Sequence, residues 1–132
     1  MIPEEATDIN DMLMKSRQRL MAARLLCKEG LYEDAVNRAY YAMHLSASAL
    51  LARKGILVKT HAGLISAIGL HYIRSGELAV EHGRALNRIE VLREEVDYNI
   101  CTSISLDDVS IVISQADAFI DQVERIIVAE KT

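Results

Sequence analysis

Apolar residues recur along most of this chain at intervals of three and four, the spacing of one face of an α-helix. The first such stretch, about residues 4–29, carries a stripe made of Ile9, Leu13, Ser16, Leu20, Ala23 and Cys27. It stops at Gly30, a residue that readily adopts the left-handed backbone common at helix ends. The pattern predicts a long helix that packs one face against a bundle core.

A second stretch, about residues 32–54, is apolar or small on nearly all sides from Ala39 to Ala52. A helix of that kind contacts neighbours on several sides, so we predict that it is the central one. Gly55 should end it, and residues 55–59 should form a loop. Thr60 is then a suitable N-cap for a third helix that ends near residues 75–76.

Two more amphipathic helices are predicted, over about residues 84–98 and from about residue 106 to Ala129. The last follows Ser105 and Asp108, which have the spacing of a capping box. Because short connections make successive helices antiparallel, we predict one all-α domain over residues 1–132, an antiparallel up-and-down bundle of about five helices. In that arrangement Cys27 and Cys101 lie at opposite ends, and both should be reduced.

Composition narrows the class of protein without identifying a reaction. The net charge of −4, with both signs interspersed, argues against a surface that attracts nucleic acid throughout. The first residues lack the pattern of a signal peptide and no stretch is apolar enough to span a membrane, so we expect a cytoplasmic protein. Phosphate-binding glycine loops and metal-ligand spacings are absent from the sequence, so neither a cofactor nor a metal is expected.

Candidate chemistry begins in the predicted central helix, where segment 37–44 places Arg38, Tyr41 and His44 within about two turns. Buried polar groups need partners. The structural explanation is that Asp34 pairs with Arg38 one turn later, while the Tyr and His tips reach the surface.

A second cluster comprises Arg93, Asp97 and Tyr98 at the end of the fourth predicted helix. If this helix and the central helix run in the same direction, His44 and Asp97 lie at matching heights, about 20 Å along each. The hypothesis is therefore a shared groove in which arginines bind an anion such as a phosphate. His61, directly after the predicted N-cap, is a third candidate and should be neutral there.

These segments resemble the HEPN superfamily of small helical bundles, in particular the prokaryotic branch associated with minimal nucleotidyltransferases. The similar positions are residues 37–44, Leu50 and Leu51 before Gly55, His61 after the loop, and residues 92–98. The resemblance implies a homodimer and a nucleotidyltransferase partner in a toxin and antitoxin type of pair. Some HEPN proteins are metal-independent ribonucleases, and a nucleotide or RNA is a candidate ligand.

The ribonuclease signature of that superfamily is an Arg followed four to six residues later by a His. Arg93 occupies the similar position, but Asp97 and Tyr98 follow it instead of a His. Arg38 and His44 have the spacing but lie in a different helix and point about 120° apart. No catalytic residue is therefore assigned, and the candidates are His44, Arg93 and Tyr98.

Three functions remain open at this point. The first is a homodimeric module that binds a nucleotide or a partner through Arg38, Tyr41, Arg93 and Tyr98. The second is a metal-independent ribonuclease that uses an Arg with His44, His61 or Tyr98 as acid or base. The third is a helical scaffold in which the polar residues only set helix register.

Overall fold

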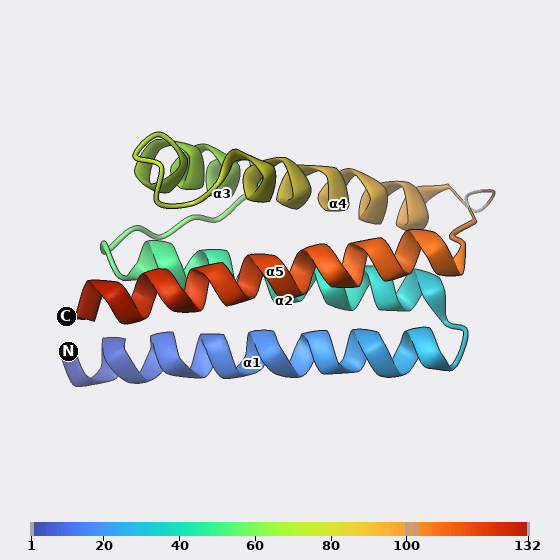
Figure 1. Cartoon of the computed structure of the whole chain (residues 1–132), viewed down its shortest axis with the longest axis horizontal. Helices are drawn as coiled ribbons and strands as arrows, with labels where there is room; N and C mark the ends of the chain where they lie inside the picture. The colour runs from blue at the N-terminus through green and yellow to red at the C-terminus, as the bar shows by residue number, and fades with distance from the viewer. Residues whose placement is uncertain (1, 100, 102, 132) are drawn as a thin grey trace.

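The computed structural model describes residues 2–99, 101 and 103–131 and consists of helices joined by short connections (Figure 1). The α-helices are α1 (Ile2–Lys28), α2 (Tyr32–Ala52), α3 (His61–Ile68), α4 (Val80–Tyr98) and α5 (Leu106–Lys131). A π-helical turn, η1 (Gly69–Ile73), continues α3. No strand occurs in this described part, which confirms the predicted all-α bundle of about five helices.

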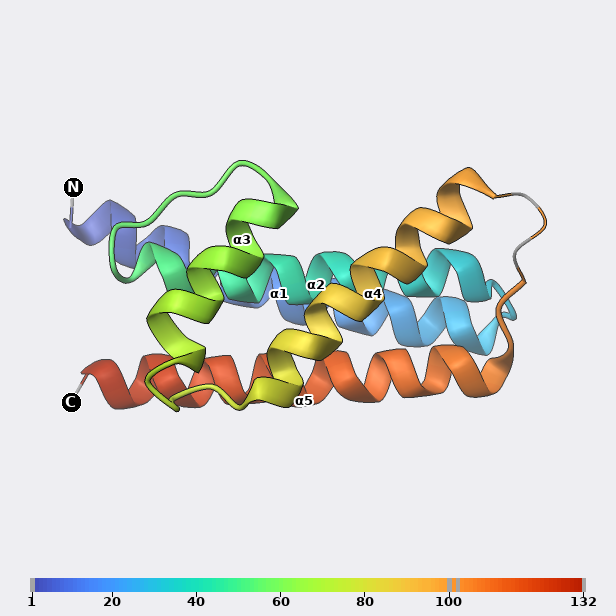
Figure 2. The same ribbon diagram turned by 90° about the horizontal axis from the view of Figure 1, so that it is seen from above.

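The central helix of the bundle is α2, as predicted from its apolar and small residues. It lies between α1 on one side and α3 with α4 on the other, with α5 alongside it (Figures 1 and 2). Its alanines at positions 35, 39, 42, 47 and 49 are all fully buried. Small side chains let neighbouring backbones approach closely, which is why one helix can contact four others.

The main core fills the space between α1, α2 and α5. The predicted α1 stripe contributes the buried Ile9, Leu20 and Ala23, and its polar member Ser16 donates a hydrogen bond to the Ala42 carbonyl at 2.6 Å. The predicted face of α5 is buried throughout: Val109, Val112, Ile113, Ala116, Phe119, Ile120, Val123 and Ile127. Burying each large apolar side chain contributes about 1.5–3 kcal/mol, so this core dominates the stability of the fold.

Most helix ends in the structure lie close to the residues predicted from the sequence. Gly30 and Gly55 have φ of +81° and +73°, values that side chains with a Cβ rarely adopt. The Gly63 N–H donates to Thr60 Oγ1 at 2.9 Å, which confirms the predicted N-cap. Ser105 and Asp108 exchange two hydrogen bonds, of 3.1 and 3.2 Å, as a capping box does.

The direction of α4 differs from the prediction. The predicted third helix corresponds to α3 and η1 together. This segment runs across the bundle instead of along it (Figure 2). As a result α4 runs antiparallel to α2, and the prediction that they share a direction was wrong (Figure 1). The α1–α2 and α4–α5 connections therefore lie at the same end, so Cys27 and Cys101 are not at opposite ends, although both are free. No helix in the described residues is long and apolar enough to span a membrane.

Candidate functional site

A cluster of polar and aromatic side chains fills the junction of α2, α3 and α4, with Tyr40 at its centre. The Tyr40 side chain is almost completely buried, at 3% exposed. Its ring lies 5.3 Å from the Tyr41 ring, and 5.8 Å from both the His44 and His61 rings. The Arg93 guanidinium lies 4.9 Å from the centre of the Tyr40 ring, within cation–π range. We call these five residues, together with Glu90 and Asp97, the Tyr40 cluster.

One side of the Tyr40 cluster joins three helices through polar atoms. The Tyr40 hydroxyl and His61 Nδ1 are 3.2 Å apart, a hydrogen bond whose direction depends on the imidazole tautomer. His61 Nδ1 is also 3.8 Å from Glu90 Oε2. Because His61 opens α3 directly after the Thr60 cap, the cap holds the ring at this junction.

Arg93 is held by carboxylates on its own helix. Its Nη2 and Nε donate to the two oxygens of Glu90 at 2.6 and 3.3 Å, one turn away. Its Nη1 donates to Asp97 at 2.8 Å on the other side. Two-pronged pairing of this kind is strong and geometrically specific, so the guanidinium is neutralised and fixed within the chain.

The surroundings fix the charges of Glu90 and Tyr40. Burial opposes the ionisation of Glu90, but hydrogen bonds from Arg93 and Tyr40 outweigh it, so the pKa of Glu90 lies below its usual value. Burial, followed by the nearby Glu90 carboxylate, raises the pKa of Tyr40 well above that of a free phenol. Glu90 is therefore ionised at neutral pH, and Tyr40 is a neutral hydroxyl that can donate a hydrogen bond.

His44 is half-buried against the Tyr40 ring. Burial lowers the pKa of His44, and the nearby His61 lowers it further. His44 is thus neutral at pH 7 and, on these grounds, is able to accept a proton in a reaction. No carboxylate is hydrogen-bonded to it among the described residues, so nothing orients its ring as a paired catalytic base requires.

The structure brings together most but not all of the site residues predicted from sequence. Gathered in the Tyr40 cluster are Tyr41, His44, His61, Arg93 and Asp97. Tyr98 lies outside it, with 84% of its side chain exposed. Arg38 is also exposed, and the predicted pair with Asp34 is absent from the ion pairs of the described chain. Within the described part of the chain, Arg93 is therefore the one arginine that reaches the cluster, and the predicted fork of two arginines does not form there.

Arg38 instead lines a neighbouring cavity of about 200 Å³ together with Leu26, Asp34, Asn37 and Tyr41. Asn37 Oδ1 is buried next to it and has no hydrogen-bond partner among the residues that the structure describes. Tyr41 belongs to both places: it lines this cavity, and its ring lies 5.9 Å from the Arg93 guanidinium. The exposed edge of the Tyr40 cluster therefore continues onto an open polar surface.

Two members of the cluster, Tyr40 and Glu90, were missed as site residues. Glu90 is 3% exposed, a rare position for a carboxylate, and such a residue is buried only when paired. A signal was present in the sequence, since Glu90 follows the apolar Leu86 by four residues and precedes Arg93 by three. That spacing places a carboxylate on the core side of α4 beside the arginine.

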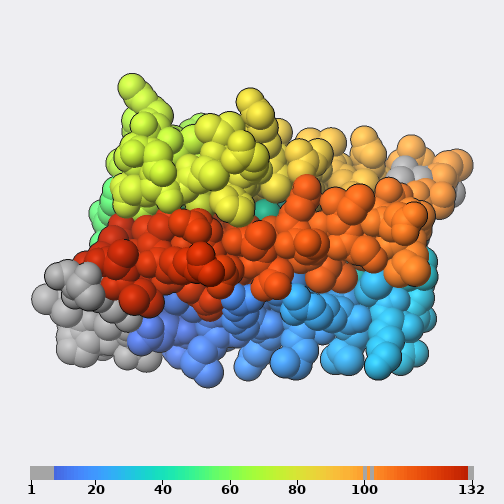
Figure 3. Space-filling view, viewed as in Figure 1, coloured from blue at the N-terminus to red at the C-terminus, as the bar shows by residue number. Residues whose placement is uncertain are grey.

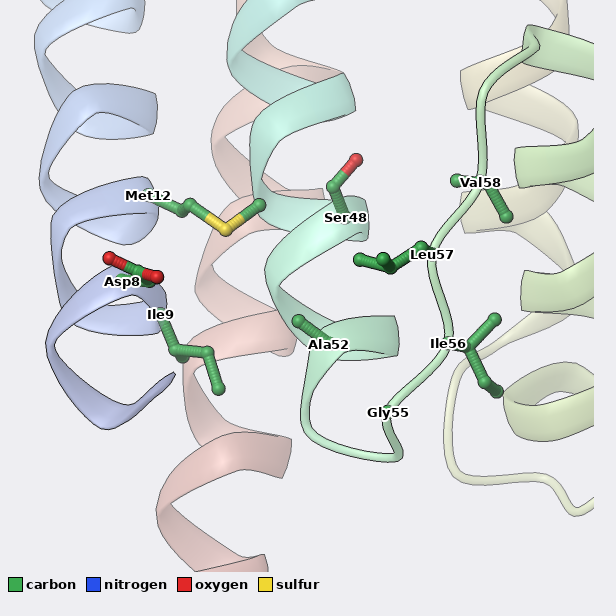
Figure 4. A pocket seen from close by; sticks show the side chains of 9 residues that line it. All are labelled: Asp8, Ile9, Met12, Ser48, Ala52, Gly55, Ile56, Leu57 and Val58. Atoms are coloured by element: carbon green, nitrogen blue, oxygen red, sulfur yellow. The ribbon is translucent and has the colours of Figure 1, made fainter. Parts of the chain in front are cut away.

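Elsewhere in the described residues, the hollows and clusters give no second chemical centre. A cavity of about 410 Å³ lies between the start of α1, the end of α2 and residues 55–58 (Figure 4). Its lining is mainly aliphatic, including Ile9, Met12 and Leu57, with only Asp8 charged. In the residues that the structure describes, no group of His, Cys, Asp and Glu is suited to hold a metal ion.

Comparison with known proteins identifies the family. The HEPN domain matches residues 9–126, nearly the whole chain. This chain belongs to the HEPN domain family. A crystal structure of TT1696 from Thermus thermophilus has a similar fold, with a TM-score of 0.74 over 89% of this chain and 96% of that one. The sequence identity to it is 14%, so this likeness concerns the fold alone.

Curated relatives of this HEPN chain come from archaea and bacteria. It is 33% identical to "Putative toxin MJ0605" of Methanocaldococcus jannaschii, over 89% of this chain and 87% of the relative. It is 37% identical to a UPF0332 protein of Gloeobacter violaceus, over 90% of this chain and 92% of the relative. The predicted HEPN membership is therefore confirmed. The word toxin belongs to the name of the Methanocaldococcus jannaschii relative.

Proposed function

We propose that this HEPN protein is a homodimeric binding module of a toxin and antitoxin type of pair, and that its partner is a minimal nucleotidyltransferase. A nucleotide is the alternative ligand for the same face. The observation that carries the proposal is the state of Arg93, whose guanidinium is occupied by Glu90 and Asp97. An arginine neutralised in this way supports the architecture of the site and is not presented to the phosphate of a substrate.

The binding face in this proposal comprises the exposed edge of the Tyr40 cluster together with Tyr98 and Arg38, two exposed residues that lie outside the cluster. Tyr41 and Tyr98 are 44% and 84% exposed, and Arg38 is exposed without an ion pair in the described chain. Tyrosine and arginine are enriched among residues that dominate binding at protein interfaces. Both also suit a nucleotide, since a phenol ring stacks on a base and an arginine pairs with phosphate.

Binding is tested by co-expressing the chain with a minimal nucleotidyltransferase from the same genome and measuring affinity of the purified proteins by calorimetry. The proposal predicts a stable complex that Tyr98→Ala weakens by about tenfold or more, which corresponds to about 1.4 kcal/mol. Arg38→Glu should weaken it as well.

Leu57→Ala provides the matched control, because Leu57 is 88% exposed and lies away from this face. It should leave the affinity unchanged. Titration with ATP distinguishes the nucleotide alternative from the protein partner. A folded chain that binds neither the nucleotidyltransferase nor ATP would contradict the proposal.

Metal-independent cleavage of RNA is the second candidate, and one observation favours it. Two imidazoles, a phenol and a guanidinium meet in the Tyr40 cluster, which are groups capable of acid, base and electrostatic roles. For this activity Arg93 must leave at least one of its carboxylates to contact phosphate.

A further inference from the structure

The cavity beside Tyr41 is lined by polar groups that lack partners. Its lining comes from α1 and α2, and we call it the Arg38 cavity: Leu26, Asp34, Asn37, Arg38 and Tyr41. Asn37 Oδ1 is buried and accepts no hydrogen bond within the described residues. Asp34 and Arg38 are one turn apart on α2, yet neither has an ion pair in the described chain. Buried polar groups normally have partners, so the unused positions here indicate a site for a ligand.

The Arg38 cavity lies at one end of the bundle. The end of α1 and the first turns of α2 meet there and form part of the molecular surface, light blue in the space-filling view (Figures 1 and 3). Leu26 and Asn37 are partly buried, whereas Asp34, Arg38 and Tyr41 are exposed. The cavity therefore has an aliphatic side chain and an amide at its base, and charged and aromatic groups at its rim.

The size of the cavity limits what it holds. Its volume of about 200 Å³ is below the range of about 300–1,000 Å³ that is usual for sites enclosing a whole small molecule. One compact group of a ligand therefore enters it, and the rest stays outside. Tyr41 follows Asn37 by four residues, so its ring stands on the same face of α2, and it is 44% exposed. An exposed aromatic ring in this position favours a flat group that stacks on it.

The hydrogen-bonding groups of the cavity select among flat groups. The two carboxylate oxygens of Asp34 and Asn37 Oδ1 are acceptors, and the Arg38 guanidinium offers two parallel donors. Guanine carries the matching set, because its N1–H and N2 amino group donate while its O6 and N7 accept the two-pronged pairing with an arginine. Adenine has one amino group between two accepting ring nitrogens, so it leaves several of these protein groups without a partner.

We propose that the Arg38 cavity binds the guanine base of a nucleotide. This deepens the proposed function, because it rests on a nucleotide as the ligand of this face and names the base. Asp34 accepts from N1–H and from the N2 amino group, and Arg38 donates to O6 and N7. Rotation of the Asn37 amide about χ2, a soft torsion, turns Oδ1 toward the second N2 hydrogen. Tyr41 stacks on the base, and the sugar and phosphate remain outside the cavity.

Calorimetric titration of the purified full chain with GMP, AMP and IMP tests the base. GMP should bind at least about tenfold more tightly than AMP, because adenine does not complete the contacts with Asp34 and Arg38. IMP lacks the N2 amino group and should have an intermediate affinity. Guanosine should keep most of the affinity of GMP, because the contacts inside the cavity are made by the base.

Asp34→Asn should change which base is bound, because it exchanges one acceptor for a donor. The variant should bind GMP about tenfold or more weakly. It should bind xanthosine monophosphate, which has a carbonyl in place of the N2 amino group, more tightly than the wild-type chain does. A merely structural effect would not produce this gain. Asp107→Asn is the matched control, since Asp107 is also an exposed aspartate in the first turn of a helix and does not line the cavity. It should leave the affinity for GMP unchanged.

Equal affinity for GMP and AMP would overturn the proposal, as would GMP binding that guanosine loses, or an Asp34→Asn variant without the gain for xanthosine monophosphate. The nucleotidyltransferase is titrated in parallel. A chain that binds the nucleotidyltransferase or ATP without a preference for guanine contradicts the guanine site alone. A chain that binds GMP selectively but ignores the nucleotidyltransferase contradicts the proposed protein partner and leaves the guanine site standing.

Discussion

The two sides of α2 are packed by different kinds of chemistry. Toward α1 and α5 the helix buries aliphatic side chains, and the buried serines Ser16 of α1 and Ser46 of α2 each donate to a backbone carbonyl. Toward α3 and α4 it buries Tyr40 against an imidazole, a carboxylate and an arginine. Packing on the aliphatic side depends only on the volume and shape of the side chains. The polar side is stable only while each polar side chain keeps its hydrogen-bond or ion-pair partner.

The largest loss of stability should come from the aliphatic side. Phe119 is fully buried in the core, and the centre of its ring lies 5.9 Å from the centre of the His82 ring. Phe119→Ala should lower the free energy of unfolding by about 3–5 kcal/mol, because it removes apolar contacts and leaves a cavity. Urea unfolding measures this, and Phe119→Leu should have a clearly smaller effect.

On the polar side, Glu90→Ala should cost about 3 kcal/mol, because it leaves the partly buried Arg93 with one carboxylate instead of two. Replacing both members, as Glu90→Leu with Arg93→Met, should recover much of that loss, since an apolar pair has no unpaired charge. Equal destabilisation by the single and double variants would show that packing, and not pairing, governs this side.

Acidification should weaken the polar side. The pKa values of His44 and Glu90 are both lowered by folding, so the unfolded chain binds more protons at mildly acidic pH. Stability should therefore fall as the pH drops below about 6.5 and again below about 4.5, the ordinary pKa values of the two groups. Urea unfolding of His44→Phe across this range should show a smaller first decline, and His82, whose pKa is also lowered by burial, accounts for the remainder; an unchanged profile would exclude His44 as a source.

The smallest effect on stability belongs to the surface. Tyr98→Ala should change the free energy of unfolding by less than about 0.5 kcal/mol, because the side chain is 84% exposed. The same variant should weaken the nucleotidyltransferase complex. A large loss of stability would instead assign Tyr98 to the fold.

The sequence was most informative where local physics decides the outcome. The period of the apolar residues located all five helices, and Thr60, Gly30 and the pair of Ser105 and Asp108 marked their ends. The pairing of Arg93 with Asp97 was likewise readable, because residues four apart share a helix face.

Contacts between helices were harder to predict. The helical period of the apolar residues does not indicate how a short segment such as α3 is oriented in the bundle. The crossing of α3 over the bundle, and the direction of α4 that follows from it, were therefore not predicted. His61 reaches Tyr40 only through that crossing. Arg38, though close to Tyr40 in sequence, lies on the exposed face of α2, and only tertiary packing separates these two residues.

The most direct test of the central claim, that Arg93 serves the cluster and not a substrate phosphate, is an RNA cleavage assay. Purified wild-type protein is incubated with single-stranded RNA in the presence of a chelator, and the products are separated on a gel. The account predicts intact RNA with a folded protein. Cleavage that is abolished by both Arg93→Ala and His44→Ala, with each variant still folded, would contradict it and establish the ribonuclease.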